Sequence, residues 1–144
     1  MRHRTVRQIM SCVGICQQPP WASVRDACRL MVEHRCGSVL VVDGGRLLGI
    51  FTEGDAVERV FACGCDPDQT LLEEVMTPEP DTIGPNQSVD EVIRRMDEFG
   101  YRHLPVVDGR EVVGVLSIRD LSIEDLAAMH AELESRRTIA ERAW

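Results

Sequence analysis

The sequence has no apolar run long enough to cross a membrane and no excess of positive charge. A bilayer span needs about 20 consecutive apolar residues, and a signal peptide needs an apolar segment behind its basic start. Residues 1–7 are basic, but no such segment follows them. The formal net charge of the 144-residue chain is −8, which argues against a nucleic-acid-binding surface. We therefore expect a cytoplasmic protein that contacts neither a membrane nor nucleic acid.

The six cysteines lack the spacing of a typical metal site. Zinc ligands commonly come in Cys-x-x-Cys pairs, whereas three residues separate Cys12 from Cys16 and one separates Cys63 from Cys65. Because no secretory signal is evident, we interpret the cysteines as reduced thiols. A four-thiolate metal site, or a redox pair at 63–65, stays open as a minor alternative.

What the sequence does contain is an internal repeat. At an offset of 65 residues, segment 20–56 aligns with segment 85–121, and 12 of the 37 aligned pairs are identical. Two copies with several elements each predict a pseudo-twofold pair rather than a solenoid. We expect the copies to occupy residues 1–66 and 67–144, with the loop at 63–68 between them.

Each copy has the pattern of a strand, a helix, two strands and a helix. Apolar residues recur with helical spacing after Ser23, over about 23–35, and again after Ser88. Two apolar runs that flank an Asp-Gly pair follow in each copy and predict a hairpin. The runs are nearly continuous, so we expect sheets that are covered on both faces. The fold class is α/β (α+β), with two β-α-β-β-α lobes.

A long C-terminal helix is expected from near Ile118 to residue 142, either continuous or broken at Ser122. Its outer half is interpreted as a dimerisation surface or, equally, as a solvated tail.

Residues 114–120 are the best candidate for a binding site. A helix that begins at Ser117 would present unpaired N–H groups, which attract phosphate. Arg119 adds donors suited to phosphate, and Asp120 can accept hydrogen bonds from sugar hydroxyls. The Ser-x-x-Asp pattern is also a capping box with a purely structural role, and both readings stay open.

These motifs resemble the CBS (cystathionine β-synthase) domain family in its tandem form, the Bateman module. The resemblance rests on Gly-x-x-Thr/Ser-x-x-Asp at 49–55 and 114–120, on the hairpin motif at 103–109 and on Val-Met-Thr-Pro at 75–78. It covers about residues 5–125. It implies two lobes that pack sheet to sheet about a pseudo-dyad, with two clefts that bind adenosine compounds. Members regulate an attached or partner protein and usually catalyse nothing.

The resemblance implies that the second copy is the better site. Ser117 and Arg119 would face phosphate and Asp120 the ribose. The base would be framed by Thr82, Ile83, Tyr101, Arg102, His103, Leu104 and Pro105.

The first copy keeps Thr52 and Asp55 but has Gly54 where the family often has arginine. Its base would be framed by Gln18, Gly37, Ser38 and Val39. Losing a charged contact to phosphate costs about 1.5–3 kcal/mol. We therefore expect the first site to bind more weakly, to prefer a ligand with less phosphate, or to be empty.

The resemblance implies a regulatory module with no catalytic cofactor. AMP is the first expectation for its ligand, followed by ATP, ADP, S-adenosylmethionine or NAD. We expect a homodimer that acts on an unidentified effector protein. An enzyme is not expected, because no nucleophile with a nearby base is evident, and His103 is expected to contact a base or to pack. The alternative is a CBS pair with empty clefts that serves only as an interaction module.

Overall fold

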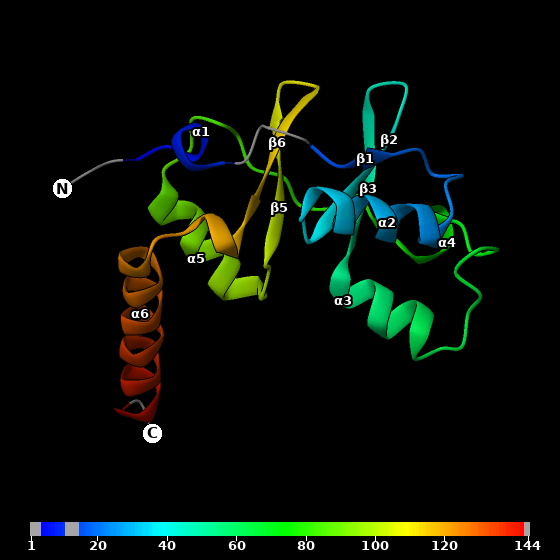
Figure 1. The fold of residues 1–144 in the computed structure, drawn as a ribbon. Helices are drawn as coiled ribbons and strands as arrows, with labels where there is room; N and C mark the ends of the chain where they lie inside the picture. Colours follow the sequence, from blue (N-terminus) through cyan, green and yellow to red (C-terminus); the bar gives the residue numbers. More distant parts are fainter. Residues whose placement is uncertain (1–3, 11–14, 143–144) are drawn as a thin grey trace.

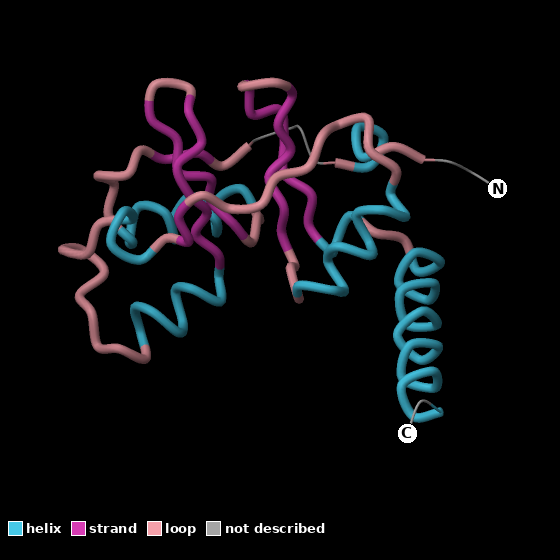
Figure 2. Tube along the Cα trace, turned by 180° about the vertical axis from the view of Figure 1, so that it is seen from behind, coloured by secondary structure: helices cyan, strands magenta, loops and turns pink. Residues whose placement is uncertain are grey.

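Two lobes, each built around a β-hairpin, stand side by side in a computed structural model that describes residues 4–10 and 15–142 (Figure 1). The first hairpin consists of β2 (Ser38–Asp43) and β3 (Arg46–Thr52), and the second of β5 (His103–Asp108) and β6 (Glu111–Ser117). Both hairpins have the same register irregularity, at Val41/Val42 and at Val106/Val107. The two tips point to the same side of the molecule in both views (Figures 1 and 2). The pseudo-twofold repeat predicted from the sequence is confirmed.

The sheet of the first lobe is completed by two short strands. β1 (Gln17–Gln18) runs parallel to β2, and β4 (Thr77–Pro78) runs antiparallel to β3, which gives the order β1-β2-β3-β4. A Cβ on Gly49 would lie 2.8 Å from the backbone oxygen of Thr77, so the glycine lets β4 approach. In the second lobe, Ile83 makes one parallel bridge to Val106, at the place where Gln18 pairs with Val41 in the first.

The two main helices occupy the predicted positions. α2 (Val24–His34) and α5 (Val89–Phe99) are capped by Ser23 and Ser88. The Ser23 hydroxyl accepts the backbone N–H of Asp26 at 3.1 Å, and the Ser88 hydroxyl accepts that of Glu91 at 3.2 Å. Each buries one apolar face, as the helical spacing predicted. The buried residues are Val24, Ala27 and Met31 in α2, and Val89, Val92, Ile93 and Met96 in α5.

The lobes exchange short helices. α1 (Val6–Ile9) opens the first repeat, yet Val6 is fully buried in the core of the second lobe and its N–H donates to the carbonyl of Gln87 at 2.9 Å. α4 (Leu72–Val75) opens the second repeat, yet Leu72 is buried in the first core and its N–H donates to the carbonyl of Ala22 at 2.9 Å. Each core is therefore completed by the segment that begins the other repeat.

The segment after β6 is divided rather than continuous. A 3₁₀ turn, η2 (Ile118–Asp120), is followed by the extended and buried Leu121, and α6 (Ile123–Arg142) begins only after Ser122. The Ser122 hydroxyl accepts the N–H of Asp125 at 3.1 Å, and the Asp125 carboxylate accepts the N–H of Ser122 at 2.8 Å. The break at Ser122 is thus confirmed, and a helix that runs on from Ile118 is wrong, because Leu121 turns inward to the core.

The corresponding segment of the first lobe continues without a break. α3 (Glu53–Asp55) passes directly into the π-helical turns of η1 (Ala56–Phe61). Across residues 4–10 and 15–142, no helix combines the length and the apolar character that a bilayer crossing requires.

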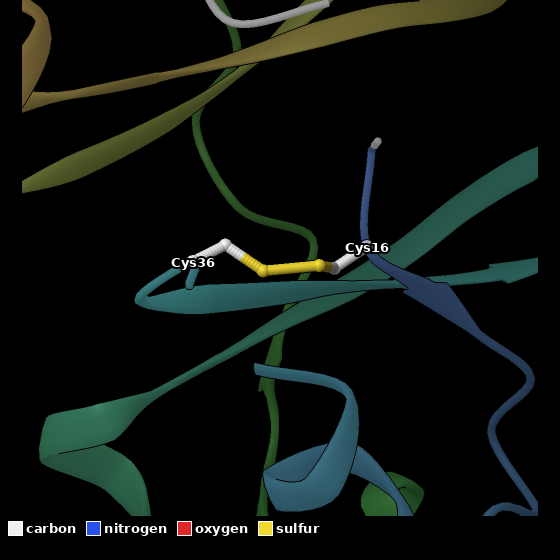
Figure 3. Close-up of a disulfide and its surroundings, with 2 residues drawn as sticks. All are labelled: Cys16 and Cys36. Atoms are coloured by element: carbon white, nitrogen blue, oxygen red, sulfur yellow. A yellow bond between two sulfur atoms is a disulfide. The ribbon is translucent and has the colours of Figure 1, made fainter. Parts of the chain in front are cut away.

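Cys16 and Cys36 form a disulfide (Figure 3). The expectation that all six cysteines are reduced thiols is therefore wrong for this pair. The Cys16 carbonyl accepts the N–H of Leu40 at 2.8 Å at the start of the β1–β2 pairing, and this contact brings Cys16 beside the turn that holds Cys36. Of the other described cysteines, Cys28 is partly buried and Cys63 and Cys65 are exposed, all as free thiols.

Candidate functional site

A cleft of about 710 Å³ lies at the end of the hairpins opposite their tips. Four segments line it: the end of β3 with the start of α3, the chain after β4, the turn before β5, and the end of β6 with η2. The first segment belongs to the first repeat, and the second follows β4, the strand that the second repeat adds to the sheet of the first lobe. The other two segments belong to the second lobe. The cleft is therefore a joint product of both lobes.

Eight of the predicted site residues line this cleft. Six come from the second copy and two from the first: Tyr101, Arg102, His103, Leu104, Ser117 and Arg119, with Thr52 and Asp55. The structure thus brings the Thr52 and Ser117 motifs of both repeats to one cavity. Their roles toward a ligand stay predictions.

Four predicted residues of the second copy are not part of the cleft lining: Thr82, Ile83, Pro105 and Asp120. Ile83 and Pro105 are buried in the sheet, where the N–H of Ile83 donates to the carbonyl of Pro105 at 3.0 Å. Thr82 is exposed, and its carbonyl accepts a hydrogen bond from Arg95 at 3.1 Å. The backbone of Ile83 and Pro105 is committed to strand pairing in this structure.

The two motif aspartates close their own turns. The Asp120 carboxylate accepts the N–H of Ser117 at 2.8 Å, and that of Asp55 accepts the N–H of Thr52 at 3.0 Å. The capping interpretation of the Ser/Thr-x-x-Asp pattern is therefore confirmed at both sites. A ribose contact would come in addition to this structural role.

The predicted base frame of the first copy lies outside this cleft. Gln18 pairs with Val41 in the sheet, and Ser38 and Val39 are buried in β2. Gly37 lies directly beneath the cleft lining: a Cβ there would be 2.7 Å from Glu53 Oε1 and 2.8 Å from His103 Nε2. Glycine at this position leaves room for a side chain from each lobe.

The side chains of Glu53 and His103 belong to a polar cluster that crosses the boundary between the lobes. Glu53 Oε1 lies 3.7 Å from Arg119 Nη2. Burial lowers the pKa of His103; Arg119 and Arg102 lower it further, against the opposing effect of Glu53 and Asp120. His103 is therefore neutral at pH 7, and both the Glu53 carboxylate and the Arg119 guanidinium lie close enough to act on its charge.

Sequence reasoning missed the acidic part of the cleft. Besides Asp55, four carboxylates line it: Glu53, Glu58, Glu79 and Asp81. Against these five acidic residues stand the two guanidinium groups of Arg102 and Arg119. Of the four, only Glu53 lies inside a motif, so only Glu53 could have been flagged from the sequence. Glu79 and Asp81 reach the cleft through the pairing of β4 with β3.

An aromatic side chain is fixed at the same rim. The Tyr101 hydroxyl donates a hydrogen bond to the Asp81 carboxylate. The Tyr101 ring stacks on Phe99, with 5.6 Å between the ring centroids. These two contacts hold Tyr101 at the mouth of the cleft, where a planar group can pack on it.

Comparison with known proteins settles the family. The model of the CBS domain matches residues 22–62 and 72–125. The chain belongs to the CBS domain family. The resemblance inferred from the motifs is thereby confirmed.

Relatives of this CBS pair come from distant organisms. The chain is 36% identical over 133 residues to the CBS domain-containing protein CBSCBSPB3 of Arabidopsis thaliana; the match covers 88% of the chain and 24% of that protein. A solved structure of a protein with CBS domains from Burkholderia ambifaria is 38% identical, with a TM-score of 0.74 over 81% of this chain and 90% of the other. The CBS pair thus spans about a quarter of its plant relative.

A further neighbour was solved with ligands. The CBS domain pair of protein MJ0100, in complex with 5′-methylthioadenosine and S-adenosyl-L-methionine, is 27% identical, with a TM-score of 0.74 over 83% of this chain and 93% of the other.

One of the four cysteines of the alternative four-thiolate metal site is not available as a ligand. Cys16 is engaged in the disulfide, and Cys12 lies outside the described residues. Cys63 and Cys65 direct their thiols to the carbonyls of Glu58 and Arg59, at 3.3 Å and 3.7 Å. Within the described part of the chain, no three His, Cys, Asp or Glu side chains are grouped so as to hold a metal ion.

Proposed function

We propose that this CBS pair is a regulatory module that binds an adenosine ligand in the cleft between its lobes. The observation that carries the proposal is the meeting of Thr52, Ser117 and Arg119 with Tyr101 in one cavity. Its volume of about 710 Å³ lies within the range of roughly 300–1,000 Å³ typical of small-molecule sites. The adenosyl ligands of the MJ0100 pair support the same class of ligand.

In this proposal, side chains rather than a helix dipole hold the phosphate. The turn η2 is only three residues long, and two of its N–H groups are engaged: Ile118 donates to the carbonyl of Arg102 at 2.9 Å and Arg119 to the Ser117 hydroxyl at 3.2 Å. The Arg119 guanidinium at the rim and the Ser117 hydroxyl would therefore make the phosphate contacts. Asp120 would accept the ribose hydroxyls.

The test is a thermal-shift screen of the full chain against AMP, ADP, ATP, S-adenosylmethionine and NADH. A ligand at 100 times its Kd stabilises the fold by about 2.7 kcal/mol. We expect AMP or S-adenosylmethionine to raise the melting temperature, and Asp120→Ala to abolish that rise. Because Asp120 also closes its turn, each variant is compared with its own ligand-free melting temperature.

A matched control separates a specific contact from surface charge. Arg119→Gln should weaken the shift caused by AMP, whereas Arg94→Gln, an exposed arginine on α5 outside the cleft, should leave it unchanged. No shift with any of the five compounds would contradict the proposal and favour an interaction module with empty clefts.

The proposal includes an assembled state that acts on a separate effector protein without catalysis of its own. Exposed apolar side chains support it: Phe61 is 87% exposed on η1, and Ile123 is 87% exposed at the start of α6. An isologous dimer is the commonest way to cover such a surface. Light scattering of the same samples should give the molar mass of a dimer.

A further inference from the structure

The residue expected to hold a phosphate already has a partner from the other lobe. Arg119 Nη2, on η2 of the second lobe, lies 3.7 Å from Glu53 Oε1 at the start of α3 in the first lobe. The side chains are 72% and 58% exposed, so the pair is weak and exchangeable. Carboxylate and phosphate oxygens are equivalent partners for a guanidinium group. Glu53 therefore occupies the place that the phosphate of a ligand would take.

The position of Glu53 does not depend on Arg119. The Glu53 N–H donates to the carbonyl of Gly37 at 3.1 Å, and the preceding Thr52 accepts the N–H of Asp55 at 3.2 Å and so caps the helix. Since Gly37 has no side chain, the Glu53 carboxylate can lie against it beside the His103 imidazole. Its negative charge therefore stays in the cleft after Arg119 moves to a ligand.

Cations are few beside Glu53: besides Arg119, the cleft lining holds the guanidinium group of Arg102, against five acidic residues. Burial lowers the pKa of His103, so the imidazole beside Glu53 is neutral at pH 7. The other side chains on this side of the cleft are mostly acidic and include Asp55, Glu58, Glu79 and Asp81. A triphosphate would place about four negative charges next to these groups, and like charges a few ångströms apart repel strongly where water is partly excluded.

We infer that Glu53 of the first repeat sets the charge of the ligand that the second repeat's site accepts. The cleft takes adenosine ligands with one phosphate, none, or a cationic group, in preference to di- and triphosphates. Glu53 acts as a specificity-determining residue because it competes with added phosphates for Arg119 and repels them. This inference rests on the proposed function, since it concerns the ligand of the same site.

The experiment is calorimetric titration of the full chain with adenosine, AMP and ATP in the absence of divalent cations. We expect the wild-type protein to bind ATP more weakly than AMP. In Glu53→Gln, the affinity for ATP relative to adenosine should rise about three- to fivefold, the range expected for loss of one exposed ion pair. The affinity for adenosine itself should stay within about twofold. Glu53→Ala, as a second variant, should reproduce the shift.

Two controls separate the Arg119 contact from a general effect of charge. Glu58→Gln removes an equal charge from the same cleft, at a residue that forms no salt bridge with an arginine in the described part of the chain. It should change the ratio less than Glu53→Gln does. Adding Arg119→Gln to Glu53→Gln should reduce the gain to the part that comes from direct repulsion by Glu53. An equal effect of Glu58→Gln, or a gain that is undiminished without Arg119, would overturn the inference.

Failure of the inference and failure of the proposed function give different results. If adenosine and AMP bind but the ATP-to-adenosine ratio is the same in wild type and Glu53→Gln, the assignment to Glu53 is wrong and the binding function stands. If the wild-type protein binds none of the three, the proposed function falls and this inference with it.

Discussion

His103 shows how the fold determines the chemistry of one side chain. It lies on β5 of the second lobe, half-buried against Gly37 and Glu53 of the first. Burial is the largest influence on the imidazole, and it lowers the pKa from the ordinary value of 6.5. As the pH falls, His103 therefore becomes protonated in the unfolded chain at a higher pH than in the folded chain.

This difference predicts a pH dependence of stability. Stability rises with pH wherever the unfolded state binds more protons, so the contribution of His103 is lost as the pH falls below about 6.5, the ordinary value of its pKa. In chemical denaturation at pH 7.5 and 5.5, the free energy of unfolding should fall at the lower pH. In His103→Gln the decrease should be smaller.

The control is His34→Gln, at the exposed end of α2. This variant should keep the full pH dependence of the wild-type protein. If the pH dependence were the same in all three proteins, His103 would not be its source.

Single residues were predictable where the signal is local. The motif spacing located Thr52, Ser117 and Arg119, which do line the cleft. Glu79 and Asp81 were missed because they reach the cleft only through the strand pairing of β4 with a distant segment. Position in space, rather than position in a motif, makes them part of the site.

Among the elements, the two Ser-x-x-Asp patterns at 117 and 122 have different outcomes. The first closes a three-residue turn and the second begins a helix of 20 residues. The sequence pattern alone could not distinguish them. The difference arises because Leu121, between the two, is buried with 6% exposure in the second core and adopts an extended backbone.

The cap at Ser122 should contribute measurably to stability. Its hydroxyl accepts the N–H of Asp125, a buried residue that also pairs with Arg4 from the N-terminal segment. Ser122→Ala should destabilise the fold by about 1 kcal/mol, the usual value for a lost N-cap. The measurement is chemical denaturation followed by helical circular dichroism.

Ser135→Ala is the matched control, because Ser135 is an exposed serine within the same helix. Alanine favours a helix interior, so this variant should be as stable as the wild-type protein or slightly more so. Equal losses in both variants would mean that the cap is not what stabilises α6.

Elements with strong local signals were predicted, and long-range connections were not. The hairpins follow from paired apolar runs around Asp-Gly, and the helices after Ser23 and Ser88 from their spacing. The exchange of α1 and α4 was not foreseen, because both segments have the same short amphipathic pattern and would fit either core. The Cys16–Cys36 pair depends on the β1–β2 pairing, which spacing does not reveal.

At the scale of the whole molecule, the disulfide is the one covalent link between distant parts of the first lobe in the described residues. The cysteines are 20 residues apart, and closing a loop of that length in the unfolded chain stabilises the fold by about 3 kcal/mol in the chain-entropy model. Reduction with dithiothreitol should lower the free energy of unfolding by that amount. Cys16→Ser combined with Cys36→Ser should do the same and make the protein insensitive to reductant.

The paired control is Cys63→Ser with Cys65→Ser, which removes two exposed free thiols. This variant should retain the wild-type stability and the wild-type response to dithiothreitol. If the effect of the reductant depended on Cys63 and Cys65 instead, the assignment of the redox-sensitive link to Cys16 and Cys36 would be wrong.

The exchanged helices also fix the order in which the protein can be completed during synthesis. Val6 leaves the ribosome long before Leu116, yet the two residues lie in the same core. The first core stays unfilled until Leu72 and Val75 have emerged. A nascent chain that stops near residue 66 would therefore expose both an apolar helix and an open core, the kind of surface that chaperones bind and that aggregates form from. Both repeats together, rather than either one alone, are therefore the unit that folds.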